Sequence, residues 1–147
     1  MSAPQPSLNA DDLTLQFERI YDSWDQALSR KDPEALLELY APDATLESPL
    51  VAHLLSTGKG VLKGHGELRP FFEMIVRRKP GLRGHIRTGF LTDGKSKIIF
   101  EYPRGTPFGE QMDFVEVMEI KNGLIQYHRV YWGWFGFKVL QADAYRR

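Results

Sequence analysis

The fold is decided by the stretch Ile125-Gln126-Tyr127-His128-Arg129-Val130-Tyr131-Trp132-Gly133-Trp134. It is rich in aromatic and β-branched residues, which favour a strand. It follows Asn122-Gly123, a pair that predicts a tight hairpin because both positions tolerate a positive φ. Upstream, residues 82–91, 98–102 and 111–120 also read as strands separated by turn residues. The second half of the chain therefore predicts an antiparallel meander.

The first half of the chain is helical in pattern. Apolar residues recur at helical spacing from Leu13 to Leu28, and this helix is expected to end near Arg30. Asp32-Pro33 predicts the start of a short second helix through Leu36, Leu37 and Tyr40, ended by Pro42. A third helix is expected from residues 64–67 to Pro80-Gly81, with Pro70 in its first turn. Residues 45–50 predict a strand and residues 51–63 a loop.

Helices followed by a meander indicate the α+β class rather than alternating α/β. A length of 147 residues is typical of one domain, expected here over residues 11–147 after a flexible tail of residues 1–10. Lysine plus arginine equals aspartate plus glutamate at 19 each, which argues against a nucleic-acid partner. No apolar run approaches the ~20 residues of a membrane span. With no cysteine and no signal-peptide pattern, a cytoplasmic protein is expected.

Several landmarks together resemble a known family. They are Asp32-Pro33, the run Leu39-Tyr40-Ala41-Pro42-Asp43-Ala44-Thr45, Gly64 with the helix after it, and Asn122-Gly123 leading into residues 129–132. This pattern resembles the SnoaL-like group of the nuclear-transport-factor-2-like superfamily. The resemblance implies a cone-shaped, curved antiparallel sheet wrapped around a long N-terminal helix plus two shorter helices. It also implies an enclosed apolar pocket and a homodimer formed through the sheet.

The superfamily includes ketosteroid isomerase, limonene epoxide hydrolase, polyketide cyclases, dehydratases and pure binding proteins, so the fold alone does not give the function. Ser48 stands where the resemblance places the base of the isomerase, and Trp24 where it places the oxyanion tyrosine. Serine cannot shuttle a proton at neutral pH without a separate base. Val130 stands at the position of the last-strand aspartate of the epoxide hydrolase. The chain therefore departs from the catalytic residues of the isomerase and of the epoxide hydrolase at these positions.

Candidate proton-transfer residues follow from the alternation of side chains along strands. His128 shares one strand face with Val130 and Trp132, and the resemblance places that face toward the pocket. On the preceding strand Glu116 is expected to face inward with Phe114, Met118 and Ile120. A change of one residue in the hairpin register would make Asp113 the matching acid instead. The candidate catalytic residues are Glu116, His128 and Asp113.

The candidate ligand-binding residues are those expected on the walls or at the mouth of the pocket: Trp132, Trp24, Tyr21, Phe17, Ser48, His53, Met118 and Val130. The four histidines form neither a His-x-His nor a His-x-x-x-His pair, so no metal is expected. No organic cofactor is expected either.

Two functions remain open. The first is a pocket protein that acts on a small, mostly apolar molecule with a carbonyl or hydroxyl group, by acid/base proton transfer of the isomerase, cyclase or dehydratase kind. The second is a non-catalytic module of the same fold, which binds a ligand or serves as a dimeric interaction surface. The sequence does not decide whether the protein is an enzyme.

Overall fold

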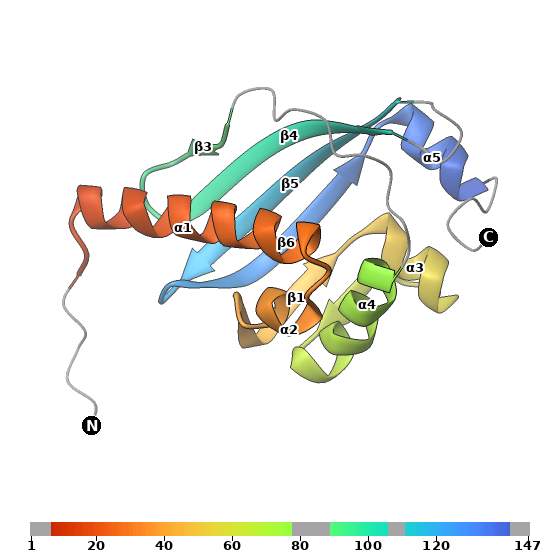
Figure 1. Ribbon diagram of the computed structural model, residues 1–147, viewed down its shortest axis with the longest axis horizontal. Coiled ribbons are helices and arrows are strands. Elements are labelled where there is room, and N and C mark those ends of the chain that lie inside the picture. Colours follow the sequence, from red (N-terminus) through yellow and green to blue (C-terminus); the bar gives the residue numbers. More distant parts are fainter. Residues whose placement is uncertain (1–6, 78–88, 106–110, 142–147) are drawn as a thin grey trace.

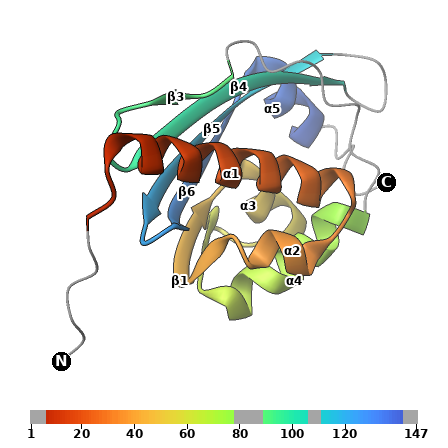
Figure 2. The same ribbon diagram turned by 60° about the vertical axis from the view of Figure 1, so that its left-hand side comes forward.

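The computed structural model describes residues 7–77, 89–105 and 111–141. The elements in chain order are α1 (Ala10–Ser29), α2 (Pro33–Leu37), β1 (Tyr40–Glu47), α3 (Pro49–Leu55), β2 (Val61–Lys63), α4 (His65–Arg77), β3 (Leu91–Thr92), β4 (Lys97–Gly105), β5 (Gln111–Lys121), β6 (Leu124–Trp132) and α5 (Trp134–Gln141). Helices α1, α2 and α4 lie on one side of a curved sheet, as Figures 1 and 2 show. The α+β class is confirmed.

The sheet has the strand order β2-β1-β6-β5-β4-β3. The strands β4, β5 and β6 form the predicted meander of antiparallel neighbours. The pairing of β1 with β6, however, is parallel, with Leu46 opposite His128. The expectation of a wholly antiparallel sheet is therefore wrong, and the sheet is mixed. This one parallel pair joins the first half of the chain to the second.

Local signals in the sequence account for several boundaries, and those at Asp32-Pro33 and Asn122-Gly123 were predicted. The side chain of Asn9 caps α1 by accepting a hydrogen bond from the backbone N–H of Asp12 at 2.9 Å. Asp32 caps α2 in the same way, with Pro33 at the first helical position. Asn122 and Gly123 have φ angles of 53° and 76°, which confirms the hairpin turn before β6.

The region between α2 and α4 differs from the prediction. Helix α2 ends at Leu37, and Tyr40 opens β1 instead of closing a helix. Ser48 and Pro49 then start a short helix, α3, because serine is a good N-cap and proline fits the first helical position. The strand expected over residues 45–50 is confirmed for residues 45–47, but it begins earlier, at Tyr40, and ends at Glu47. The loop expected over residues 51–63 is wrong at both ends, where α3 and β2 lie, and holds only for residues 56–60. Residues 61–63 pair with β1 as strand β2.

Two further differences concern helices. Pro70 is the sixth residue of α4, so it lies in the second turn rather than the first. Proline has no backbone N–H, so the helix lacks one hydrogen bond at this position. The buried side chains of Leu68, Phe71 and Phe72 stabilise the helix against the core. After β6 the chain turns at Gly133 into α5, which the sequence did not predict. Of the strand expected over residues 82–91, residues 82–88 lie outside the described residues.

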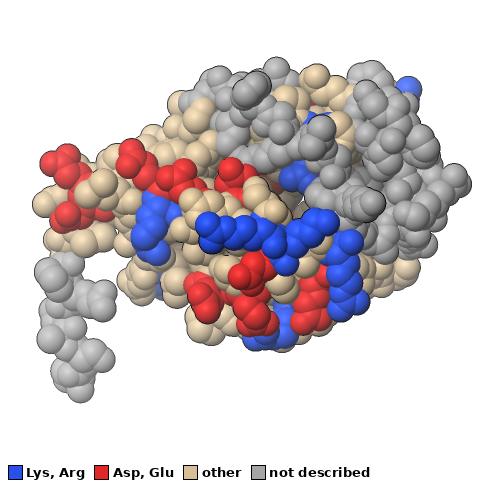
Figure 3. All heavy atoms as spheres, in the orientation of Figure 1, with Lys and Arg blue, Asp and Glu red and all other residues tan. Residues whose placement is uncertain are grey.

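The helices meet the sheet across a continuous apolar core. From α1 the buried residues are Phe17, Ile20, Trp24 and Ala27, and α4 adds Leu68, Phe71, Phe72 and Val76. Charged residues of both signs are intermixed over the outer surface of the helical layer, as Figure 3 shows. An ion pair between Arg69 and Glu34 joins α4 to α2 on that surface. No described helix is both long and apolar enough to cross a membrane.

Candidate functional site

The inward face of the meander carries its polar residues in the middle of an apolar surface. On β4 the inward residues Ile98, Phe100 and Tyr102 alternate with exposed ones, as side chains along a strand do. On β5 Glu116 lies opposite Phe100, and on β6 His128 lies opposite Met118. Glu116 and His128 therefore point to the same side of two neighbouring strands. They are buried although both are polar.

Four side chains are linked by hydrogen bonds inside the core. Tyr40 Oη lies 2.7 Å from His128 Nδ1, and His128 Nε2 lies 2.6 Å from Glu116 Oε2. The Tyr102 hydroxyl donates to the other carboxylate oxygen, Glu116 Oε1, at 2.7 Å. We call Tyr40, His128, Glu116 and Tyr102 the buried polar chain. Their exposed fractions are 1, 2, 3 and 4 % respectively.

The donors and acceptors of the buried polar chain fit together in one direction. An ionised carboxylate only accepts hydrogen bonds, so His128 Nε2 carries a hydrogen and donates it to Glu116. A neutral imidazole then has an acceptor at Nδ1, which receives the Tyr40 hydroxyl. The Trp24 indole N–H, which can only donate, reaches the oxygen of Tyr40. When Glu116 is ionised and His128 is neutral, each of the four groups therefore has a hydrogen-bond partner.

Burial decides the protonation of Tyr40. Loss of solvent around the phenol raises the pKa of Tyr40 far above its ordinary value, and the negative charge of Glu116 raises it further. The hydrogen bond from Trp24 lowers that pKa only in part. Tyr40 is therefore a hydrogen-bond donor at neutral pH and cannot accept a proton from a ligand.

The apolar residues expected to bind a ligand surround the buried polar chain. Phe17, Trp24 and Met118 are buried in the core. The rings of Trp24 and His128 meet edge to face with centroids 6.1 Å apart. Tyr21 is partly buried and packs edge-on against Phe100, with ring centroids 5.0 Å apart.

Val130 and Trp132 continue this inward surface toward the end of β6. Val130 is partly buried and lies opposite Glu116. Trp132 is also partly buried, and its ring meets Phe114 edge to face with centroids 4.7 Å apart. The inward surface therefore becomes more open along β6 beyond His128.

Ser48 and His53 belong to α3 rather than to a loop. Ser48 is buried, and its Oγ accepts a hydrogen bond from the backbone N–H of Leu50 at 3.2 Å. Its hydroxyl thus serves as the N-cap of α3. His53 lies in the last turn of that helix and is partly buried.

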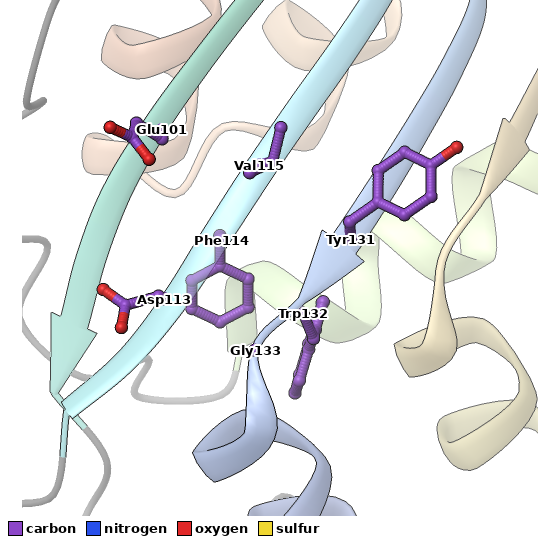
Figure 4. Close-up of a pocket in the computed structure, with 7 residues that line it drawn as sticks. All are labelled: Glu101, Asp113, Phe114, Val115, Tyr131, Trp132 and Gly133. Carbon is purple, nitrogen blue, oxygen red and sulfur yellow. The ribbon is translucent and has the colours of Figure 1, made fainter.

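Asp113 lies on the opposite face of the sheet from Glu116. It is exposed and lies three residues from Glu116 along β5. Because side chains alternate along a strand, an odd separation directs the two carboxylates to opposite faces. The structure thus brings together Glu116 and His128 but leaves Asp113 outside the core. Asp113 instead lines a surface hollow of about 450 Å³ near the end of β6, with Glu101, Phe114, Val115, Tyr131, Trp132 and Gly133, as Figure 4 shows.

Sequence reasoning missed Tyr40 and Tyr102 as members of the site. Tyr40 was assigned to the second helix because it follows Leu36 and Leu37 at helical spacing. Tyr102 lies in a strand that the sequence predicted, but its bond to Glu116 depends on a diagonal contact between β4 and β5. A buried carboxylate needs hydrogen-bond donors, and that requirement is the signal that points to a nearby inward tyrosine. Among the described residues no group of three or more His, Cys, Asp or Glu side chains could hold a metal ion.

One comparison with known protein families gives a match. The sequence pattern of the SnoaL-like domain matches residues 17–128. No curated protein matches the chain.

Solved structures match along most of the chain. A steroid delta-isomerase from Pseudomonas aeruginosa is 15 % identical, with a TM-score of 0.69, covering 99 % of this chain and 95 % of its own. The epoxide hydrolase/cyclase-like enzyme SalBIII, described in pyran ring formation in the polyether salinomycin, is 23 % identical, with a TM-score of 0.59, covering 84 and 95 %. An NTF-2 like protein of unknown function from Burkholderia xenovorans is 19 % identical, with a TM-score of 0.64, covering 82 and 84 %. At these identities the likeness concerns the fold alone.

Proposed function

The chain belongs to the family of SnoaL-like domains, and from that premise we propose that it binds a small, mostly apolar molecule with a carbonyl or hydroxyl group and transfers a proton with Glu116. The observation that carries the proposal is the 2.6 Å contact between His128 Nε2 and Glu116 Oε2 inside an apolar core. A buried carboxylate is costly unless it is hydrogen-bonded, and such groups are often found where proton transfer takes place.

Both nitrogens of His128 are already engaged, Nδ1 by Tyr40 and Nε2 by Glu116. His128 is therefore a positioning residue in this proposal: it holds the Glu116 carboxylate and keeps a fixed tautomer. Glu116 is the group with a free acceptor direction on its oxygens, since each accepts one bond from the described chain. This assigns the proton acceptor to Glu116 alone.

A reaction next to a carbonyl illustrates the chemistry. Glu116 removes a proton from the carbon beside the carbonyl, the C–H bond breaks, and its electron pair moves to the carbonyl oxygen to give an enolate. Glu116 is then a neutral carboxyl group, which accepts a weaker hydrogen bond from the Tyr102 hydroxyl than a carboxylate does. This hydroxyl can therefore donate to the new oxyanion instead. Where a carbon–carbon double bond adjoins that carbon, the enolate extends over it, and return of the proton to the far end of this double bond completes an isomerisation. The similar folds of an isomerase and a cyclase-like enzyme support this class of reaction.

Replacing Glu116 by glutamine tests the proposal, because an amide keeps the shape but cannot accept the proton. We expect the wild-type protein to accelerate the exchange of hydrogen for deuterium beside the carbonyl in a panel of cyclic and aryl ketones in D₂O. Glu116→Gln should lower the rate by about 10²–10⁴-fold, whereas Asp113→Asn should leave it unchanged because Asp113 lies on the outer face. Proton NMR of the ketones measures the exchange.

The alternative is a protein that binds without chemistry, in which the buried polar chain only holds the fold together. In that case the wild-type protein would bind ketones of the panel without accelerating exchange. Equal exchange rates in the wild type and in Glu116→Gln would likewise remove Glu116 as the proton acceptor.

We also propose that two copies associate through the outer face of the sheet. One row crosses all six strands there: Val61, Glu47, Arg129, Val117, Ile99 and Leu91. Val61, Ile99 and Leu91 are exposed apolar residues. In the middle of the row Arg129 binds Glu119 at 2.6 Å and lies over the Tyr127 ring. An apolar surface with an ordered arginine and aromatic centre is typical of interfaces.

Ile99→Glu should convert the dimer to a monomer, because it places a charge at an exposed apolar position of this face without touching the core. Leu15→Glu is the matched control, since Leu15 is exposed on α1, away from the sheet. Sedimentation velocity at several concentrations measures the change. A wild-type protein that sediments as a monomer throughout would overturn this part of the proposal.

A further inference from the structure

Arg104 lies at the open end of the inward face. It follows Ile98, Phe100 and Tyr102 at every second position along β4, and it pairs with Met112, which is fully buried. Side chains at these positions share one face of a strand. Arg104 is therefore directed to the same side as the buried polar chain, and it is partly buried.

The surroundings of the Arg104 guanidinium are aromatic rather than acidic. Its central carbon lies 5.9 Å from the centroid of the Tyr102 ring, a cation–π contact. Within the described parts of the chain, no carboxylate oxygen lies within 4.0 Å of this guanidinium. The other described arginine on the sheet, Arg129, is by contrast bound to Glu119. Among the described residues, the Arg104 guanidinium thus contacts an aromatic ring and donates no hydrogen bond to a side chain.

Along β4, β5 and β6, the described positions that face the same side as Arg104 include no lysine and no second arginine. A single guanidinium matches one carboxylate, which it can bind through two parallel hydrogen bonds. A phosphate dianion would call for more positive charge than this face offers.

The distance between Arg104 and Glu116 fits a ligand with two ends. Glu116 lies opposite Phe100, and Arg104 is four residues further along β4. At a rise of about 3.3 Å per residue, the two backbone positions are about 13 Å apart along the strand. The arginine side chain lies over Tyr102, whose hydroxyl is bonded to Glu116. A ligand carboxylate bound by Arg104 would thus lie at one end of the ligand, with the apolar part between it and the negative charge of Glu116.

We propose that Arg104 is the anchoring residue of this site and that its ligand is an apolar keto acid, with a carboxylate at the open end and the carbonyl beside Glu116. This inference rests on the proposed function, because it assumes that the ligand reaches the buried polar chain. It adds the substrate class and the residue that selects it.

A matched pair of probes tests the inference: 4-oxo-4-phenylbutanoate, an aryl ketone with a terminal carboxylate, and its uncharged amide. Calorimetry should show that the wild-type protein binds the acid about tenfold more tightly than the amide, as expected for one charge-assisted pair. Arg104→Gln should abolish this preference, and Arg104→Lys, which keeps the charge but not the flat fork, should retain a smaller one. Arg30→Gln is the control with the same change in net charge, since Arg30 is exposed at the end of α1.

The outcomes separate the inference from the proposed function. Equal affinity of the wild type for the acid and the amide, or a preference that survives in Arg104→Gln, would overturn the role of Arg104 and leave the proposed function standing. Binding of neither probe and of none of the neutral ketones would overturn both. Circular dichroism and thermal unfolding of each variant would show that it is folded, so that a lost preference reports on the site.

Discussion

His128→Phe should lower the free energy of unfolding by about 3–5 kcal/mol, the range for removing one partner of a buried polar pair. Phenylalanine fills nearly the same space, so the loss comes from hydrogen bonds rather than from a cavity. The Glu116 carboxylate would stay buried with one donor fewer, and the Tyr40 hydroxyl would lose its acceptor. Urea unfolding followed by circular dichroism measures the change.

Two variants sharpen this measurement. Tyr127→Phe removes a hydrogen bond to Glu47 on the outer face, and it should cost less than about 1 kcal/mol because solvent can replace that bond. A double-mutant cycle of His128→Phe with Glu116→Gln should show a coupling free energy of about 1.5–3 kcal/mol, since the two groups bond directly. A loss below about 1 kcal/mol for His128→Phe, or additivity in the cycle, would contradict a tightly bonded chain.

Trp24→Ala should be about as damaging, with an expected loss of about 3–5 kcal/mol. Trp24 is 5 % exposed and meets the rings of Phe100 and His128 edge to face. Its removal leaves a cavity beneath α1 and takes away the indole hydrogen bond to Tyr40. The free energy of unfolding from denaturant titration is again the measurement.

The chain supplies its own control for this substitution. Trp134, on α5, is 65 % exposed, so Trp134→Ala should change the free energy of unfolding by less than about 1 kcal/mol. Trp24→Phe should fall between the two, because it keeps an aromatic ring but loses the N–H. Equal losses for Trp24→Ala and Trp134→Ala would show that α1 is not held by the buried face described above.

The parts of the fold that could be predicted are those governed by local chemistry. The cap at Asp32, the turn at Asn122-Gly123 and the alternation along β4 each depend on a few neighbouring residues. The inward direction of Glu116 followed from the same alternation, although the sequence left Asp113 as an alternative. The choice between Glu116 and Asp113 depends on the register of the hairpin, which places Glu116 opposite Val130.

The parts that could not be predicted depend on contacts between distant segments. Tyr40 fits a helix by spacing, and it becomes a strand residue because β1 pairs with β2 and β6. The sequence cannot reveal that its hydroxyl meets a histidine 88 positions away. Ser48-Pro49 is a recognisable helix start, but a strand pattern precedes it, and the two signals compete at the same residues.

The parallel pairing of β1 with β6 sets an order of assembly for the interior. Tyr102, Glu116 and His128 come from consecutive strands, with 14 and 12 positions between bonded partners, so closing these short loops costs little entropy. Tyr40 joins only when β1 docks across a separation of 88 positions, a contact of the kind that slows folding. Glu116 and His128 are thus brought together by antiparallel neighbours alone. Tyr40, which fixes the tautomer of His128, joins them last. A chain arrested before this docking step would hold a histidine whose Nδ1 is still open to solvent.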